Sequence, residues 1–397
     1  QDEDTVKGML EIIYRCDHFL RAISGLDKFS FQTGGGTHGI FANACMLRAY
    51  HEERGEGEQR NEVITTIFSH PANAATAATA GFRVITLYPE ENGYPSVEAL
   101  KQALSERTAG LFITNPEDTG LYNPHIKEFT RLVHEAGGLC IYDQANANSI
   151  IGVARAREAG FDMCHFNLHK TFGAPHGGSG PACGASGVRQ ELARYLPTPT
   201  VEFDGSRYYL DYNRPHSVGK IKGFHGNVQA VLRSFAWILS LGPDGIKQVA
   251  ETAVLNSNYL ASKLVKLRGI TLPWNPKTRR LEQVRYSCHK LTEETGVSTV
   301  DLANRITDYG VTDWYPSHHP WLVPEPITLE PSETYSKDDL DEYAAIVACM
   351  VEEAYTNPSV FKTAPHRSTM KPIDASAAAD PKQWAFTWRM LKSKTAD

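Results

Sequence analysis

The sequence lacks any run of roughly 20 apolar residues, the length that a membrane-spanning helix requires. It also lacks a basic start followed by an apolar stretch, so no secretory signal peptide is visible, although the chain begins with Gln1 rather than Met. We therefore expect no membrane partner.

A cysteine pattern typical of disulfide bonds is missing as well. The seven cysteines are odd in number and widely spaced, and no CxxC motif occurs. This pattern is typical of free thiols in a reducing compartment, so we predict a cytoplasmic protein.

An excess of basic residues is also absent, because 40 lysines and arginines face 46 acidic residues, giving a net charge of -6. A nucleic-acid partner is therefore not expected. The remaining composition is ordinary, with 41% hydrophobic and 22% charged residues, which indicates a folded globular chain.

Apolar runs alternate with helical patterns over the first 240 residues. The runs are typical of buried strands and cover residues 63–68, 84–88, 110–114, 139–143 and 163–168. Ser96 is a candidate N-cap, and Pro124 can open a helix with Phe129, Leu132 and Val133 on its apolar face. We predict an α/β fold with a mostly parallel sheet, in which ligands bind beyond the carboxyl ends of the strands.

The pattern changes after a long helical stretch over residues 228–267, which Gly242-Pro243 interrupts. Residues 280–356 then alternate strand and helix, and Ser298 and Ser336 each begin a pattern typical of a capping box. The tail beyond Pro358 is expected to be extended. The predicted organisation is an N-terminal helical segment (1–30), a large domain (31–268), a small α+β domain (269–356) and a tail (357–397).

Four features could carry chemistry. The glycine-rich turn at 34–39 leads into a helix, whose first N–H groups suit an anion. Asp143 ends a predicted strand, His70 and Lys170 follow predicted strands, and a glycine-rich stretch at 177–181 comes after Lys170. Each feature also has a plainer interpretation: a tight loop, a structural histidine, a carboxylate paired with arginine or backbone, and a surface lysine. Taken together, they favour pyridoxal 5'-phosphate (PLP), which needs its phosphate bound, its ring stacked, its pyridine nitrogen protonated and its aldehyde bound by a desolvated lysine.

The segment NLHKTFGAPHGGSGPACGASGV at 167–188 resembles the lysine segment of glycine dehydrogenase (decarboxylating), the P-protein of the glycine cleavage system. The similarity is strongest to the catalytic subunit of the two-subunit bacterial form and continues through ITNPEDTGLYNPHI (113–126), YDQANANSIIG (142–152) and LEPSETYSKDDLD (329–341). It implies a fold-type I PLP-dependent enzyme with a large cofactor domain and a small C-terminal domain.

The resemblance also implies roles for individual residues. Lys170 would bind the PLP aldehyde as a Schiff base, Asp143 would pair with the pyridinium nitrogen, and His70 would stack on the ring. Further cofactor contacts are expected from Gly36, Thr37, His169 and Asn146. Candidates on the substrate side are His38, Ile40, Asn115, Thr119 and Gln144.

Some positions depart from the family pattern. Ile40 replaces an acidic residue and Gln144 replaces a glycine, and we expect both at the edge of the pocket. One hypothesis is glycine decarboxylation, with loss of CO2 and transfer of the aminomethyl group to the lipoyl arm of H-protein. A second is a repurposed enzyme that breaks or forms a bond at the α-carbon of another amino acid. A third is a silent scaffold subunit.

A metal is not expected. His165 and His169 lie four residues apart but on a strand and the loop after it, and His318-His319 has no partner carboxylate pattern. The expected partners are an amino-acid substrate, a second copy in a homodimer, and in the family pattern a second subunit and lipoylated H-protein.

Overall fold

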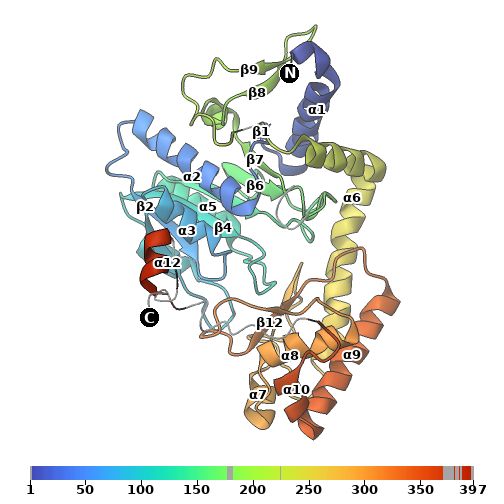
Figure 1. Ribbon diagram of the computed structural model, residues 1–397. Coiled ribbons are helices and arrows are strands. Elements are labelled where there is room, and N and C mark those ends of the chain that lie inside the picture. The colour runs from blue at the N-terminus through green and yellow to red at the C-terminus, as the bar shows by residue number, and fades with distance from the viewer. Residues whose placement is uncertain are drawn as a thin grey trace.

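A seven-stranded sheet forms the centre of the chain in a computed structural model, which describes residues 2–176, 182–223, 225–369, 380, 384 and 387–394 (Figure 1). The strand order is β1-β7-β6-β5-β4-β2-β3. Neighbouring strands from β3 to β6 are parallel, whereas β7 runs antiparallel to both β6 and β1. The strands are β1 (Lys28–Ser30), β2 (Glu62–Thr66), β3 (Arg83–Leu87), β4 (Thr108–Thr114), β5 (Leu139–Gln144), β6 (Met163–Asn167) and β7 (Gly184–Val188).

Helices cover both faces of this sheet. Alternate residues of a strand point to opposite faces, and here both faces carry apolar side chains that need to be covered. Leu111 and Ile113 of β4 enter one buried cluster, while Phe112 enters the other. The predicted N-cap is confirmed, since Ser96 accepts the N–H of Ala99 at 3.1 Å. The helices are α1 (Lys7–Ser24), α2 (Gly36–Glu53), α3 (Ala72–Thr79), α4 (Val97–Ala103) and α5 (Ile126–Glu135), with short 3-10 helices at Glu3–Thr5 and Gln190–Tyr195.

Helix α6 (Val228–Leu264) runs along one side of the molecule and leads to a second core (Figure 1). It is interrupted at Gly242, with φ of 63°, as predicted from Gly242-Pro243. The second core surrounds the antiparallel sheet β10-β12-β11, and both predicted capping boxes are present, at Ser298 and Ser336. The elements are β10 (Val284–Ser287), α7 (His289–Thr295), α8 (Thr299–Ile306), a 3-10 turn (Thr307–Tyr309), β11 (Tyr315–Pro316), β12 (Pro326–Leu329) and α9 (Lys337–Thr356).

Other segments add to these two parts. Strands β8 (Thr200–Phe203) and β9 (Tyr208–Asp211) form a separate hairpin. The tail was expected to be extended, but it contains α10 (Ser359–Thr363) and α12 (Trp388–Lys394). Helix α10 forms because Phe361 is buried in the second core, with 1% of its surface exposed. The domain boundaries themselves stay a prediction.

All seven cysteines are free, as the spacing indicated. No helix within the described ranges combines the length and the apolar character needed to cross a bilayer.

Candidate active site

A cavity of about 870 Å³ lies where the carboxyl ends of β4 and β5 and the end of β6 approach the second core. Four predicted residues line it together: His70, Asp143, Asn146 and Lys170. The opposite wall comes from the residues around β10, β11 and β12. It includes Glu282, Arg285, His318 and Glu330, none of which was predicted to belong to the site.

Asp143 ends β5 as a buried carboxylate with 3% of its surface exposed. Its Oδ2 accepts hydrogen bonds from Asn73 Nδ2 at 3.0 Å and Thr114 Oγ1 at 3.3 Å, and its Oδ1 accepts the N–H of Ala145 at 3.0 Å. Within the described ranges it forms no ion pair. The donors fix the carboxylate without neutralising it, which leaves its charge available to a cation in the cavity.

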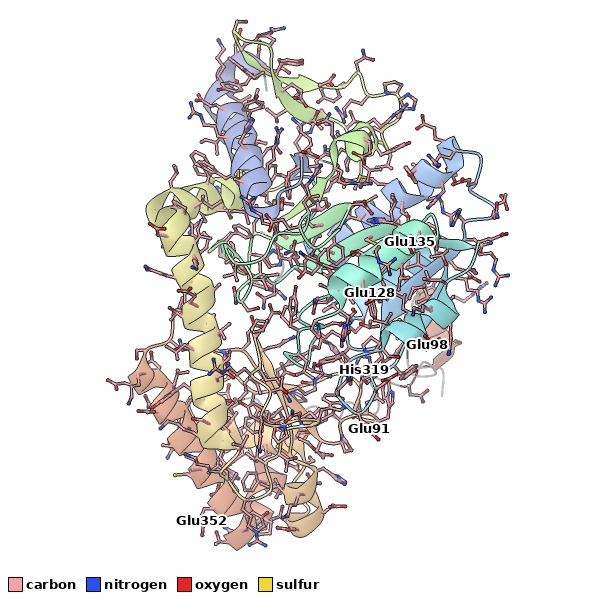
Figure 2. All side chains as sticks on the ribbon, turned by 180° about the vertical axis from the view of Figure 1, so that it is seen from behind. Glu91, Glu98, Glu128, Glu135, His319 and Glu352 are labelled. Atoms are coloured by element: carbon pink, nitrogen blue, oxygen red, sulfur yellow. The ribbon has the colours of Figure 1, made fainter. Side chains whose placement is uncertain are left out.

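His70 follows β2 and is exposed at the cavity. Its Nδ1 accepts the N–H of Ala72 at 3.1 Å, which fixes the orientation of the ring. The ring of His318 lies 6.2 Å away, edge to face. His319, which is labelled in Figure 2, packs against Phe68 in the turn after β2.

Lys170 lies in a turn directly after β6, where its N–H donates to the carbonyl of Asn167 at 3.2 Å. The sequence suggested a desolvated lysine, but in this single chain the residue is exposed. The reason is that its turn opens into the cavity instead of being covered by a helix. Residues 177–181, the predicted glycine-rich stretch after the lysine, lie outside the described residues.

The glycine-rich turn at 34–39 forms the N-terminus of α2, beginning at Gly36 and Thr37, and no side chain caps this helix. Gly36 lies beside Asn167 at the end of β6. A Cβ atom at Gly36 would be only 3.2 Å from Asn167 Nδ2. A Cβ on Gly34 would be 2.9 Å from Lys222 Nζ. The uncapped N–H groups and this cation suit an anion such as a phosphate.

Two histidines adjoin this turn. His38 uses Nδ1 to accept the N–H of Gly34 at 3.1 Å, so it stabilises the loop, and burial followed by the charge of Lys222 lowers its pKa. His169 is buried beside Gly35 and contacts the backbone of Cys183 through Nδ1. Burial lowers the pKa of His169 to about 4. Neither histidine lines the cavity.

Four residues that were predicted on the substrate side lie away from the cavity. Ile40 has no exposed surface and faces the core between α2 and the sheet. Gln144 is adjacent to Asp143 on β5, so its side chain points to the opposite face. Asn115 is 1% exposed and bonds the backbone of Asn123, while Thr119 is equally buried and accepts the N–H of Leu121. None of the four lines the cavity.

The residues that sequence reasoning missed include buried carboxyl groups. Burial raises the pKa of Glu282 well above its usual range, and the nearby charge of Glu330 adds to this shift. The pKa of Glu330 is also raised, because protein atoms surround its carboxyl group even though the residue is exposed at the cavity, and Lys170 opposes the effect. Next to the cavity, burial raises the pKa of Glu117 to about 8. No strand bounds were predicted next to Glu282 or Glu330, so no signal in the sequence marked them.

One cluster in the described part of the chain could in principle bind a metal: His134, Cys140 and Asp162. Asp162 already accepts hydrogen bonds from the N–H of Cys140 at 2.6 Å and from His134 at 2.8 Å, and it pairs with Arg189 at 2.7 Å. These partners account for the cluster without an ion.

Comparison with known proteins supplies independent information. Residues 249–366 match the family model "Glycine dehydrogenase, C-terminal domain", and residues 31–198 match "Aminotransferase class-V". A protein of Pyrococcus furiosus named "Probable glycine dehydrogenase (decarboxylating) subunit 2" is 45% identical over 99% of this chain and 77% of its own length. A protein of the same name from Caldanaerobacter subterraneus is 42% identical over 96% and 77%.

Solved structures show the same fold. A glycine decarboxylase (P-protein) of the glycine cleavage system in inhibitor-bound form aligns with a TM-score of 0.70 at 18% identity, covering 88% of this chain and 77% of that one. A sphingosine-1-phosphate lyase from Burkholderia pseudomallei aligns with 0.68 at 14% identity, covering 90% and 80%. The architecture is the predicted fold-type I.

Proposed function

Because the chain belongs to the family of glycine dehydrogenase (decarboxylating) subunit 2, we propose that it decarboxylates glycine and passes the aminomethyl group to a lipoyl carrier. Members of this family use PLP, and PLP is the cofactor of this enzyme. The observation that carries the proposal is that Lys170, Asp143 and His70 meet in one cavity.

The residues present fit PLP. Asp143 is a buried carboxylate that forms no ion pair with the described residues, so it suits the protonated ring nitrogen. The uncapped start of α2 at Gly36 and Thr37 suits the phosphate, and Lys222 adds a positive charge beside the turn. We propose His169 as a neutral support for the turn and not as a charged phosphate ligand, because burial lowers its pKa to about 4.

Each residue has a distinct part in the proposed chemistry. When bound, the cofactor supplies an electron sink for the bond broken at the α-carbon. Lys170 would supply the amine that holds the cofactor. Asp143 keeps a proton on the ring nitrogen, because a carboxylate fixed by three donors cannot turn away. His70 would cover the ring of the cofactor, and the N–H of Ala72 fixes the orientation of its imidazole.

A second candidate function is bond cleavage or formation at the α-carbon of a larger amino acid. The volume of about 870 Å³ leaves room for it, although the same cavity must also hold PLP and admit the carrier. Two sequence changes that first suggested it lose their force, since Ile40 and Gln144 face away from the cavity. Glycine therefore remains the proposed substrate.

The proposed partners follow from the family. The relatives are named as subunit 2, so we propose a companion subunit, and we propose lipoylated H-protein as the acceptor. A homodimer and a cytoplasmic location are part of the same proposal, the latter because all seven thiols are free.

The test is exchange between the carboxyl group of glycine and labelled bicarbonate, with lipoylated H-protein and the companion subunit supplied. We expect exchange with the wild-type chain and a loss of at least about 1000-fold in Lys170→Ala, because covalent attachment of the cofactor is removed. A panel of larger amino acids serves as the comparison. A PLP-loaded protein that exchanges none of the glycine label, or prefers a larger amino acid, would contradict the proposal.

A further inference from the structure

Two carboxyl groups face Lys170 from the second core. Glu282 precedes β10 and Glu330 follows β12, and these antiparallel strands pair with Val284 opposite Leu329. The two glutamates therefore leave the same end of the strand pair, and both line the cavity with Lys170.

The loop after Asp143 distinguishes the two carboxyl groups. Glu330 Oε1 accepts hydrogen bonds from Asn146 and from Asn148, the latter at 3.0 Å. Glu282 has a single weak donor among the described residues, Ser149 Oγ at 3.5 Å from Oε2. Two amide donors stabilise a negative charge on Glu330, whereas Glu282 lacks the donors that an ionised carboxylate needs.

The burial of Glu282 also favours its neutral form. Glu282 is 2% exposed, so ionising it would leave a poorly solvated charge close to a second carboxylate. Charged groups also reach the pair from the neighbouring elements: Lys170 after β6, Asp143 on β5 and Asp118 after β4. Lys170 favours ionisation and both aspartates oppose it, and the net result is that the pKa of Glu282 stays well above its usual range.

We propose that Glu282 is the proton donor of this active site, held neutral by its burial and by the charge of Glu330. This inference rests on the proposed function, in which the aminomethyl carbon attacks a disulfide of the carrier. The carbon–sulfur bond forms with the electron pair left by CO2, and the sulfur–sulfur bond breaks. The leaving sulfur takes the bonding pair and then the proton of Glu282, giving a thiol. Solvent returns a proton to the carboxylate.

The first measurement does not depend on activity. The infrared spectrum of the PLP-loaded wild type minus that of Glu282→Gln at neutral pH should contain the carbonyl band of a neutral carboxylic acid. Burial raises the pKa of Glu117 to about 8, so Glu117 contributes equally to both spectra and cancels. Glu352→Gln is the matched control, because Glu352 is exposed on α9 far from the cavity (Figure 2). A difference spectrum without this band, or the same band in the difference between the wild type and Glu352→Gln, would overturn the proposal.

The second measurement separates the two chemical steps in a single turnover. In Glu282→Gln we expect carrier thiol to form about 100-fold more slowly, within the usual range for general acids, while CO2 release changes by less than about threefold. In Glu330→Gln the side chain at 330 carries no charge, so it no longer raises the pKa of Glu282. The alkaline limb of the pH profile for thiol formation should therefore move to lower pH. Equal slowing of both steps in Glu282→Gln would overturn the donor role. A wild-type chain without glycine exchange would instead refute the proposed function, and the infrared band would still decide where the proton lies.

Discussion

Gly39 is the position where a single methyl group should disturb both the fold and the cofactor site. It lies in the first turn of α2, and a Cβ built on it would be 2.7 Å from Cγ of His165, with two other ring atoms closer still. His165 has no exposed surface and bonds Asn167 through Nε2 at 2.7 Å, so its ring cannot move aside.

The magnitude of Gly39→Ala follows from two opposing terms. Alanine favours a helix over glycine by roughly 0.5–1 kcal/mol. Overpacking a filled core costs about 1–3 kcal/mol. Because the ring is enclosed, the steric term should prevail, and we expect a net loss of about 1–2 kcal/mol in the free energy of unfolding. The start of α2 must shift, so affinity for PLP should also fall.

Urea unfolding and titration with PLP measure the two effects. Gly8→Ala on α1 is the control, since a Cβ there meets nothing within 4 Å, and its stability should stay the same or rise by up to about 1 kcal/mol. In a His165→Ala background, Gly39→Ala should cost nothing, because the overlapping ring is gone. Wild-type stability and PLP affinity in Gly39→Ala would refute this packing argument.

Three other changes test separate parts of the structure. Asp143→Asn removes a charge-assisted contact worth about 1.5–3 kcal/mol, so PLP affinity measured by absorbance should fall at least about tenfold, and unchanged affinity would contradict the assigned partner. Burial holds the pKa of His169 at about 4. Between pH ~6.5 and ~4 the unfolded chain therefore binds a proton that the folded chain does not, and stability should fall as pH drops, by up to about 3 kcal/mol. His169→Asn should flatten this slope in urea titrations, and a parallel slope would count against burial as the cause. Ser336→Ala should cost about 1 kcal/mol through loss of the capping box on α9, with Ser393→Ala on α12 as a cap-free control.

Local patterns predicted much of the fold. Ser96, Ser298 and Ser336 cap helices because their signals lie within a few residues of each other. Strand β7 was not predicted, since its sequence GASGV has few large apolar side chains and forms a strand through its pairing with β6 and β1. The helix α10 likewise depends on a distant contact, that of Phe361 with the second core.

In the candidate site, too, local patterns predicted some residues, whereas others depend on distant packing. His70, Asp143 and Lys170 were predicted to come together because parallel strands end at one edge of the sheet, and they do line one cavity. Gln144 was misplaced although strand alternation beside Asp143 indicates its direction. Glu282 and Glu330 could not be placed from the sequence, because their position beside Lys170 depends on how the second core packs against the large sheet.

The most direct test of the account is to locate the cofactor on the chain. The PLP-loaded protein is reduced with borohydride, digested and mapped by mass spectrometry. We predict a phosphopyridoxyl group on Lys170 in the wild type and on no peptide of Lys170→Ala. A label on Lys222, the cation beside the glycine-rich turn, or a wild-type chain that retains no label, would contradict the assignment of this cavity as the PLP site.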